Sequence, residues 1–421
     1  MPRDYDASRD NHAHRAKRIY DPIHRFIELD AGEVALLGSP AVQRLRRLRQ
    51  LGLAYLAFPS AEHSRFSHAL GALAIGTRAF DALRVHSPEA FDSERDFTEK
   101  RRLLRTSLLL HDLGHGPFSH ACESVLGVRH EKRTQAILEL PDLREALAAI
   151  GVEAADVLGL ITGAPDADPV LRELVSGPNL DADRMDYLLR DAYFTGVAGG
   201  TYDAEQLIES LRVLEVDGRP QLGVDGRGVV ALESFVLARY MMFATVYFHH
   251  TTRAFERVLC DVLEMLWPNP RALDDIDEFL AWDDFRVIDD LRPMQGEGVR
   301  ALRERRTVYG LAAEFNAERD LSTFELCEHA LRDRWGDAVW SDSQEQLLHR
   351  LPLGTAGGTP TVRVRLMGRI VDARAASDVI AKLSGKAYWR KLFVRTEVAS
   401  VAEARAICAD LIATGGQPRL L

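Results

Sequence analysis

The fold is decided by the stretch His111-Asp112-Leu113-Gly114-His115-Gly116-Pro117-Phe118-Ser119-His120. It begins at the C-terminal end of an apolar segment, residues 101–113, which predicts a core helix. Adjacent His111 and Asp112 cannot point the same way inside a regular helix, so both reach one centre only where the helix ends. Gly114 and Gly116 permit a bend directly beyond them. The stretch therefore predicts a helix end that presents an imidazole and a carboxylate together.

Two further side chains extend this pair into a metal-binding set. His68 ends the segment Ser64-Arg65-Phe66-Ser67-His68, and Asp183 lies in Asp181-Ala182-Asp183-Arg184. Taken alone, either residue would be interpreted as a hydrogen-bonded core histidine or a helix N-cap. Together with His111 and Asp112, they can hold one divalent metal in a mixed nitrogen and oxygen shell. The set favours a metal-dependent phosphohydrolase.

Helical patterns dominate the rest of the chain. An amphipathic helix is predicted over 40–51, because leucines and arginines there recur at helical spacing between Pro40 and Gly52. Its arginines form either a solvated face or, for one or two of them, a phosphate or interface contact; they are Arg44, Arg46, Arg47 and Arg49. Further helices are predicted over 67–86, 130–140, 143–150, 168–176 and 183–193. The predicted fold class is mainly α, a helical bundle.

Two segments interrupt the helices. Residues 211–232 contain strand-like runs split by Asp217-Gly218 and Asp225-Gly226, which predicts a small β-hairpin insertion. Strands are also predicted over 361–371 and over 391–398, after the Gly-rich loop 353–360, so the C-terminal portion is expected to be a small α/β unit. The predicted domains are a catalytic helical domain, 1–290, and a C-terminal helical and α/β region, 291–421.

Composition restricts the class of protein. The chain has 421 residues, of which 46% are hydrophobic and 28% charged, as in folded globular proteins. We expect a cytoplasmic protein with no membrane partner, since no apolar run is long enough for a span and the N-terminus lacks a signal-peptide core. The four cysteines show no CxxC spacing. A formal net charge of −10 opposes general nucleic-acid binding.

The motifs follow the order H…HD…D, which resembles the HD-domain phosphohydrolase superfamily. Residues 111–120 look like the signature of the HD-domain deoxynucleoside triphosphate triphosphohydrolases, and segments 43–52, 58–59, 65–68 and 181–187 fit the same family. The resemblance covers the chain from about residue 15 to 290. It implies an HD-domain helical bundle and one divalent metal ion (Mn, Mg, Fe, Co, Ni or Zn) of unencoded identity. Its ligands would be His68, His111, Asp112 and Asp183.

The resemblance also implies how protons move. In the family, the histidine matching His115 contacts the phosphate. The histidine matching His130, oriented by a carboxylate at the position of Glu123, acts as acid or base at the leaving oxygen. Here that partner is a glutamate, where the better-known animal members have an aspartate. The predicted catalytic residues are His115, His130 and Glu123.

Sugar recognition follows from the same resemblance. Gln50 and Asp191 would contact the sugar 3′-hydroxyl, Leu51 would pack against the 2′ carbon, and Tyr187 would stack on the deoxyribose. Such packing rejects ribonucleotides because it leaves a 2′-hydroxyl neither space nor partner. The alternative is that Leu51 and Tyr187 are ordinary core residues.

Phosphate and base contacts are implied as well. Arg65 and Arg184 resemble triphosphate clamps, since a guanidinium fork suits phosphate oxygens, and His120 is a further substrate-binding candidate. Arg65 could instead be a structural ion-pair partner. The segment 247–255 resembles a family stretch that contacts base and phosphate, but Phe255 replaces its tyrosine, and either His249 or His250 could face the site.

The predicted function is hydrolysis of a deoxynucleoside triphosphate (dNTP) to deoxynucleoside and triphosphate. Alternatives are another HD phosphohydrolase, such as a nucleotidase or phosphodiesterase, and a nucleotide sensor that does not hydrolyse its ligand. Single-stranded nucleic-acid binding through the arginine-rich segments is secondary, because the chain is acidic. The expected partners are dNTPs and further copies of the chain in a homo-oligomer.

Overall fold

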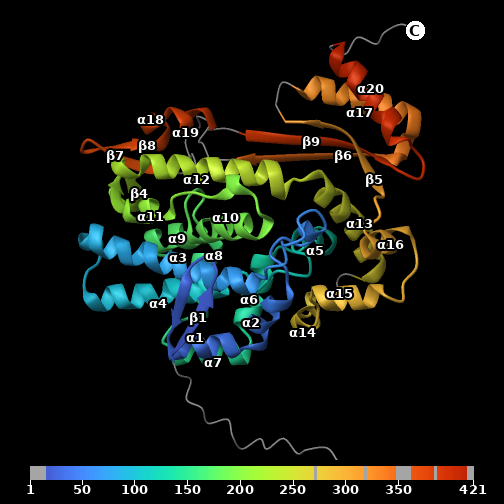
Figure 1. Cartoon of the computed structure of the whole chain (residues 1–421). Helices are drawn as coiled ribbons and strands as arrows, with labels where there is room; N and C mark the ends of the chain where they lie inside the picture. The colour runs from blue at the N-terminus through green and yellow to red at the C-terminus, as the bar shows by residue number, and fades with distance from the viewer. Residues whose placement is uncertain (1–15, 270–272, 317–319, 348–361, 384–385, 415–421) are drawn as a thin grey trace, which may run out of the picture.

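The structure is a computed structural model that describes residues 16–269, 273–316, 320–347, 362–383 and 386–414. Its mainly α architecture, with small sheets, confirms the predicted fold class (Figure 1). The Gly-rich loop predicted over 353–360 lies outside the described residues. The division into domains at residue 290 stays a prediction.

Most of the helices form one bundle around a continuous apolar core. The helices of the first half of the chain are α1 (Ala31–Gly38), α2 (Pro40–Arg44), α3 (Arg65–His86), α4 (Glu94–Leu110), α5 (His120–Leu126), α6 (His130–Leu138), α7 (Pro141–Ala149), α8 (Ala154–Thr162), α9 (Pro169–Ser176), α10 (Ala182–Thr195) and α11 (Ala204–Glu209). Those of the second half are α12 (Val229–Met242), α13 (His250–Leu266), α14 (Ile276–Leu280), α15 (Asp284–Leu291), α16 (Glu297–Glu304), α17 (Leu321–Trp335), α18 (Ala373–Ala376), α19 (Asp378–Leu383) and α20 (Val401–Ala413).

Helix α3 packs between α4 and α10 and so brings the predicted metal-binding motifs together. It begins after Ser64, whose hydroxyl accepts a hydrogen bond from the Ser67 amide and caps the first turn. Helix α10 begins in the same way, with the Asp181 carboxylate accepting from the Arg184 amide. Both starts match the predicted helices within two residues. These two caps fix where His68 and Asp183 enter the bundle.

Three sheets complete the described fold. The strands are β1 (Lys17–Asp21), β2 (Arg25–Leu29), β3 (Leu211–Val216), β4 (Arg219–Asp225), β5 (Tyr309–Phe315), β6 (Val339–Leu347), β7 (Arg363–Leu366), β8 (Arg369–Asp372) and β9 (Lys386–Arg395). β1 and β2 form a hairpin, β3-β4-β7-β8 form a mixed sheet, and β5-β9-β6 form an antiparallel sheet. In Figure 1, β6 and β9 run alongside α12. In each of the two larger sheets, strands that are distant in sequence therefore pair with one another.

Two local predictions are wrong. The helix predicted over 40–51 ends at Arg47, because Leu48 is extended and Arg49 forms a β-bridge with Ser64. The turn at Asp217-Gly218 does close the β3–β4 hairpin, but Asp225-Gly226 leads into a 3-10 turn and then α12. There the Asp225 carboxylate accepts from the Arg227 amide and starts a helix, so no third strand follows.

One apolar helical segment, Gly226–Tyr247, is long enough to cross a membrane by length and composition. In the structure it is a core element, because Leu232, Phe235 and Met242 are each no more than 1% exposed. It packs against α10, α11 and α19.

Candidate metal centre and active-site cavity

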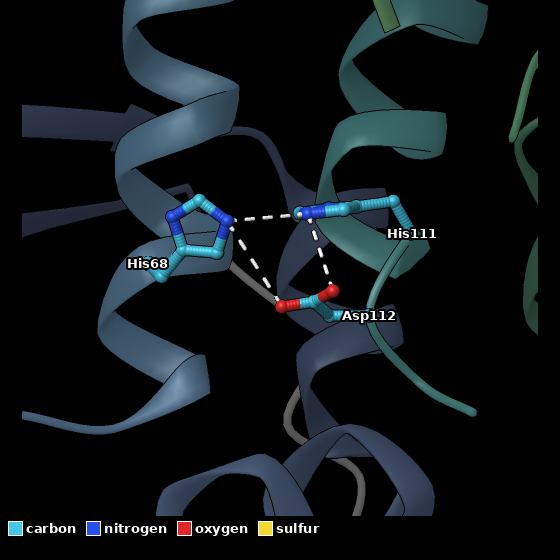
Figure 2. Close-up of side chains that lie close together, drawn as sticks. All are labelled: His68, His111 and Asp112. Carbon is cyan, nitrogen blue, oxygen red and sulfur yellow. Dashed lines mark hydrogen bonds and ion pairs between the residues drawn. The ribbon is translucent and has the colours of Figure 1, made fainter. Parts of the chain in front are cut away.

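Four side chains, from α3, from the turn that ends α4 and from α10, meet inside the bundle, and we call them the metal cluster: His68, His111, Asp112 and Asp183. The Nε2 atoms of His68 and His111 lie 3.2 Å apart, and Oδ1 of Asp183 lies 2.9 Å from the first and 3.7 Å from the second. Asp112 completes the group, with Oδ1 3.5 Å from His111 Nε2 (Figure 2). The sequence-predicted ligands thus converge.

Hydrogen bonds on the far side of each imidazole orient its ring. His111 donates from Nδ1 to the carbonyl oxygen of Leu108, at 2.8 Å, because it occupies the C-cap of α4. His68 donates from Nδ1 to the Asp186 carboxylate, also at 2.8 Å. Both Nε2 atoms are therefore left facing the carboxylates of the cluster. This arrangement of two imidazole nitrogens and two carboxylates fits a divalent metal.

The carboxylates of the metal cluster are held in the charged form. Burial raises the pKa of Asp112, but the Arg65 guanidinium, together with His111 and His115, outweighs burial and holds that pKa well below its usual range. Burial likewise opposes ionisation of Asp183, yet hydrogen bonds from His111 and His68 lower its pKa overall. Two anionic oxygens beside two imidazoles make a site that attracts a cation.

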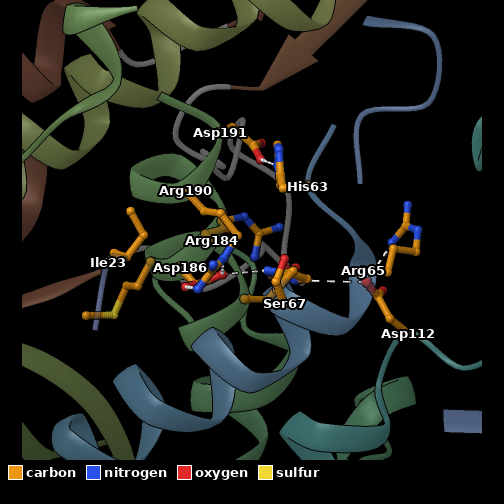
Figure 3. A network of polar contacts seen from close by, with 12 residues as sticks. Ile23, His63, Arg65, Ser67, Asp112, Arg184, Asp186, Arg190 and Asp191 are labelled. Atoms are coloured by element: carbon orange, nitrogen blue, oxygen red, sulfur yellow. Dashed lines mark hydrogen bonds and ion pairs between the residues drawn. The ribbon is translucent and has the colours of Figure 1, made fainter. Parts of the chain in front are cut away.

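A buried polar layer behind His68 was not predicted from the sequence (Figure 3). Asp186, 0% exposed, accepts from His68, from His24 at 2.6 Å and from Arg190 at 2.8 Å. Arg190 in turn donates to Asp21 at 2.8 Å. The spacing of Asp183 and Asp186 on α10 was the available signal, because residues three apart share a helix face.

Gly71 allows this layer to reach α3. A Cβ atom at Gly71 would lie 2.0 Å from the nearer oxygen of Asp186 and 2.2 Å from an Arg190 nitrogen. The absence of a side chain there lets the ion pair approach the helix backbone one turn beyond His68. The Asp186–Arg190 pair is thus built into the contact between α3 and α10.

The loop after α4 is shaped differently from the predicted glycine bend. Its left-handed residues are Phe118 and Ser119, with φ of 51° and 55°, and the glycines are needed for close packing instead. A Cβ at Gly114 would lie 1.9 Å from the carbonyl oxygen of His130. Arg44, 1% exposed, donates to the carbonyl oxygen of His115 at 2.8 Å. The solvated-face interpretation is therefore wrong for this arginine.

Arg65 contacts the metal cluster directly. Its Nη1 donates to Asp112 at 2.6 Å, and its Nη2 donates to the Ser119 hydroxyl at 2.7 Å. The structural ion-pair alternative is thus correct for Arg65. Because the residue also lines the main cavity, a phosphate contact remains a prediction.

His115, Glu123 and His130 form a second group beside the metal cluster. The two imidazoles stack with ring centroids 4.0 Å apart and an interplanar angle of 16°. Their Nδ1 atoms lie 3.3 and 2.9 Å from the same Glu123 oxygen. Burial, reinforced by Arg65, lowers the pKa of His115 to about 4. Burial also opposes charge on His130, but its hydrogen bond to Glu123 raises that pKa overall.

Both groups open into a cavity of about 650 Å³, within the usual size range of small-ligand sites. All of the predicted sugar and phosphate contacts whose side chains are described line it; they are Gln50, Leu51, Arg65, Arg184, Tyr187 and Asp191. The side chain of His120 lies outside the described residues. In the described part of the chain, the buried Oε1 atom of Gln50 has no hydrogen-bond partner.

Asp191 is held by two residues that the sequence did not single out for this role. Its two carboxylate oxygens accept from His63 Nε2 and from the Tyr247 hydroxyl, both at 2.8 Å. Tyr247 lies in a π-helical turn, Phe243–Tyr247, which continues α12. Such turns are common at functional sites, but no sequence pattern announces them.

The residues of segment 247–255 and Arg184 differ in how they meet the main cavity. Neither His249 nor His250 lines the main cavity; His249 caps α13 by accepting from the Thr251 amide. Phe255 packs in a separate apolar cluster. Arg184 donates to the Gly177 carbonyl oxygen at 2.6 Å and pairs with Asp181, so helix-end contacts already occupy much of its guanidinium.

The bundle and its central histidine and aspartate cluster define an HD-domain protein. A family model described as HD associated region matches residues 202–319. The Bacillus subtilis protein YwfO is 39% identical over 249 residues, 59% of this chain and 55% of that protein. Human deoxynucleoside triphosphate triphosphohydrolase SAMHD1 is 28% identical over 283 residues, 59% of this chain and 44% of that protein.

A crystal structure of a hypothetical protein from Aquifex aeolicus superposes with a TM-score of 0.79 and 29% identity, over 93% of this chain and 99% of that one. The similarity to two deoxynucleoside triphosphate triphosphohydrolases and the match to the HD associated region confirm the resemblance to this HD-domain family seen in the motifs. It spans about half the length of the curated relatives it matches.

Proposed function

We propose that the protein is a metal-dependent phosphohydrolase that converts a dNTP and water to deoxynucleoside and triphosphate. The observation that carries the proposal is that one cavity is lined by His111, Asp112 and Asp183 of the metal cluster, by the stacked His115 and His130, and by the predicted sugar contacts. The similarity to human deoxynucleoside triphosphate triphosphohydrolase SAMHD1 supports the substrate class.

His68, His111, Asp112 and Asp183 would hold the metal, which when bound supplies Lewis-acid activation of a phosphoryl group and of water. Arg65 keeps Asp112 ionised and oriented, and Asp186 does the same for the His68 ring. His115, kept neutral by burial and with Nε2 3.3 Å from Oδ1 of Asp112, would lie beside a bound phosphoryl group without adding charge.

His130 is suited to be the general acid. In the proposed cut, the oxygen of water bonds to the α-phosphorus, the bond from that phosphorus to the sugar 5′ oxygen breaks, and the leaving oxygen takes a proton. Glu123 raises the pKa of His130 against the effect of burial, so the imidazolium that gives this proton is present near neutral pH.

The sugar end of the cavity supports a deoxynucleotide over a simple phosphate ester. The unpartnered Oε1 of Gln50 can accept from a 3′-hydroxyl, and Asp191 is oriented nearby by His63 and Tyr247. Burial raises the pKa of Tyr187 to about 12, so its ring offers a neutral stacking face and hydroxyl. A phosphatase would have no evident use for these groups.

Product analysis tests the proposal. The protein is stripped of metal and resupplied with one divalent ion at a time, then incubated with four deoxynucleoside and four ribonucleoside triphosphates. We expect deoxynucleoside plus intact triphosphate. Nucleoside monophosphate or free phosphate would favour another HD phosphohydrolase, whereas binding without turnover would favour a nucleotide sensor.

A further inference from the structure

The antiparallel sheet β5-β9-β6 contributes a wall to the main cavity. Asp342 on β6 is 4% exposed and accepts from Arg253 of α13 through both oxygens, at 2.9 and 2.8 Å. The side-chain amide of Gln344 donates to the same carboxylate at 2.9 Å. Both Arg253 and Gln344 line the cavity. A strand more than 150 residues beyond the metal cluster thus completes the site.

The same sheet supports the π-helical turn that carries Tyr247. Trp389 of β9, 2% exposed, packs against Phe243 and Phe248, with ring centroids 6.1 and 5.0 Å away. In the strand register, Trp389 lies opposite Gln344. The polar contact of Gln344 and the aromatic contacts of Trp389 therefore lie at the same end of the cavity. We call this end the sheet wall: Tyr247, Phe248, Arg253 and Gln344.

A row of rings separates the sheet wall from the metal cluster. The ring centroids of His68 and Tyr187 lie 6.5 Å apart, those of Tyr187 and Tyr247 lie 6.0 Å apart, and those of Tyr247 and Phe243 lie 5.0 Å apart. Phe243 in turn contacts Trp389. The predicted sugar contacts Tyr187 and Asp191 occupy the middle of this row. A substrate with its phosphates at the metal cluster and its sugar in the middle would place its base at the sheet wall.

Charge at the sheet wall agrees with that orientation. Arg253 pairs with two carboxylates, Asp342 and Glu256, so this group carries a net negative charge. The neighbouring Lys391 is balanced by Glu314, 3.3 Å away. A triphosphate would be repelled there, while an uncharged base would not. The amide nitrogen of Gln344 must face Asp342, because a carboxylate only accepts, so the Gln344 oxygen is the atom left for a ligand.

We propose that the sheet wall selects nucleobases bearing an exocyclic amino group, with the Gln344 oxygen as the acceptor. This inference rests on the proposed function for the orientation of the substrate. Adenine, cytosine and guanine each carry such an amino group, and thymine does not. dTTP is therefore the poorest substrate of the four deoxynucleotides.

The test compares wild type with Gln344→Leu, which removes the acceptor and keeps the side-chain size. The matched control is Ser343→Ala, at the exposed neighbouring position on the same strand. The readout is the ratio of kcat/KM for dATP or dCTP to that for dTTP, measured in substrate mixtures. We expect Gln344→Leu to lower the ratio about fivefold, the value of one neutral hydrogen bond, and the control to leave it unchanged. An unchanged ratio in Gln344→Leu overturns the inference.

A binding assay separates this inference from the proposed function. If wild type cleaves no triphosphate, the proposed function fails, and equilibrium binding of deoxyadenosine and thymidine then decides, since neither needs a metal. Tighter binding of deoxyadenosine that Gln344→Leu abolishes supports the sheet wall. Equal binding of the two nucleosides, or none, overturns it.

Discussion

The two ends of the cavity are built in different ways. At the metal cluster, motif residues lie on three adjacent helices, and each imidazole is fixed by one further hydrogen bond, from His68 to Asp186 and from His111 to Leu108. At the sheet wall, a π-helical turn and one residue of α13, both contributing to the segment 247–255, meet a strand that no motif marks, through Asp342 and Trp389. The chemistry of the site is therefore encoded locally, and the proposed choice of substrate depends on long-range packing.

This difference predicts how substitutions act. A change at the metal cluster removes charge or a ligand atom where the transition state needs it, so it should lower turnover for every substrate. A change at the sheet wall should alter the ratio between substrates and leave the cut itself in place.

The largest effect is expected from Asp183→Ala. Losing one anionic ligand of four should weaken metal binding and lower turnover of all dNTPs by about 1,000-fold, as several kcal/mol of transition-state stabilisation disappear. Asp203→Ala, which removes an exposed helix cap on α11, is the matched control. Metal content and turnover are measured together, and full activity in Asp183→Ala would show that this residue is not a ligand.

Sequence analysis succeeded where function and local structure coincide. The ends of α4 and α10 and the four cluster residues follow from motifs placed by helices, and the Glu123–His130 pair follows from the family resemblance. It failed where the partner comes from elsewhere in the chain. Asp186 and Tyr247 lie within quoted segments, yet their roles depend on His24, Arg190 and Asp191 meeting them in space.

The helix predicted over 40–51 failed for a similar reason. Its leucine and arginine spacing favours a helix through Leu51, but tertiary contacts override that preference after Arg47. Arg49 pairs with Ser64, and its amide donates to the buried Asp284 carboxylate, so this segment turns toward the cavity and places Gln50 and Leu51 there. Neither partner could be inferred from local pattern.

Asp186→Asn tests whether the layer behind the metal cluster matters as much as the cluster itself. The substitution keeps the size of the side chain but removes the charge that orients His68 and pairs with Arg190. We expect metal affinity to fall about 10- to 100-fold, the usual effect of losing such a partner. Metal titration by calorimetry measures it, with circular dichroism to verify folding. Unchanged affinity would mean that Leu108 and helix packing suffice to orient the site.

Glu123→Gln should change the pH profile. Glu123 raises the pKa of His130, and the imidazolium form is lost as pH rises through that pKa. Removing the charge lowers the pKa, so the basic limb of the kcat profile should move to lower pH. A shift of about one unit would cost about tenfold in rate on that limb. His115 does not confuse the result, because its pKa lies at about 4. An unmoved basic limb would exclude His130 as the acid.

Leu51 lines the same cavity, and its substitution should alter only the choice between sugars. It is partly exposed, lines the cavity and packs against the main core, so both the sugar-gate and the core interpretation remain open. If it excludes a 2′-hydroxyl, Leu51→Gly should raise ribonucleotide relative to deoxynucleotide kcat/KM by about tenfold, within the range that one apolar pocket contact provides. Leu51→Ala serves as the matched variant, because Gly52 is already left-handed and a second glycine would loosen the backbone. A graded rise from alanine to glycine indicates a gate, whereas a loss of thermal stability with an unchanged ratio identifies Leu51 as a core residue.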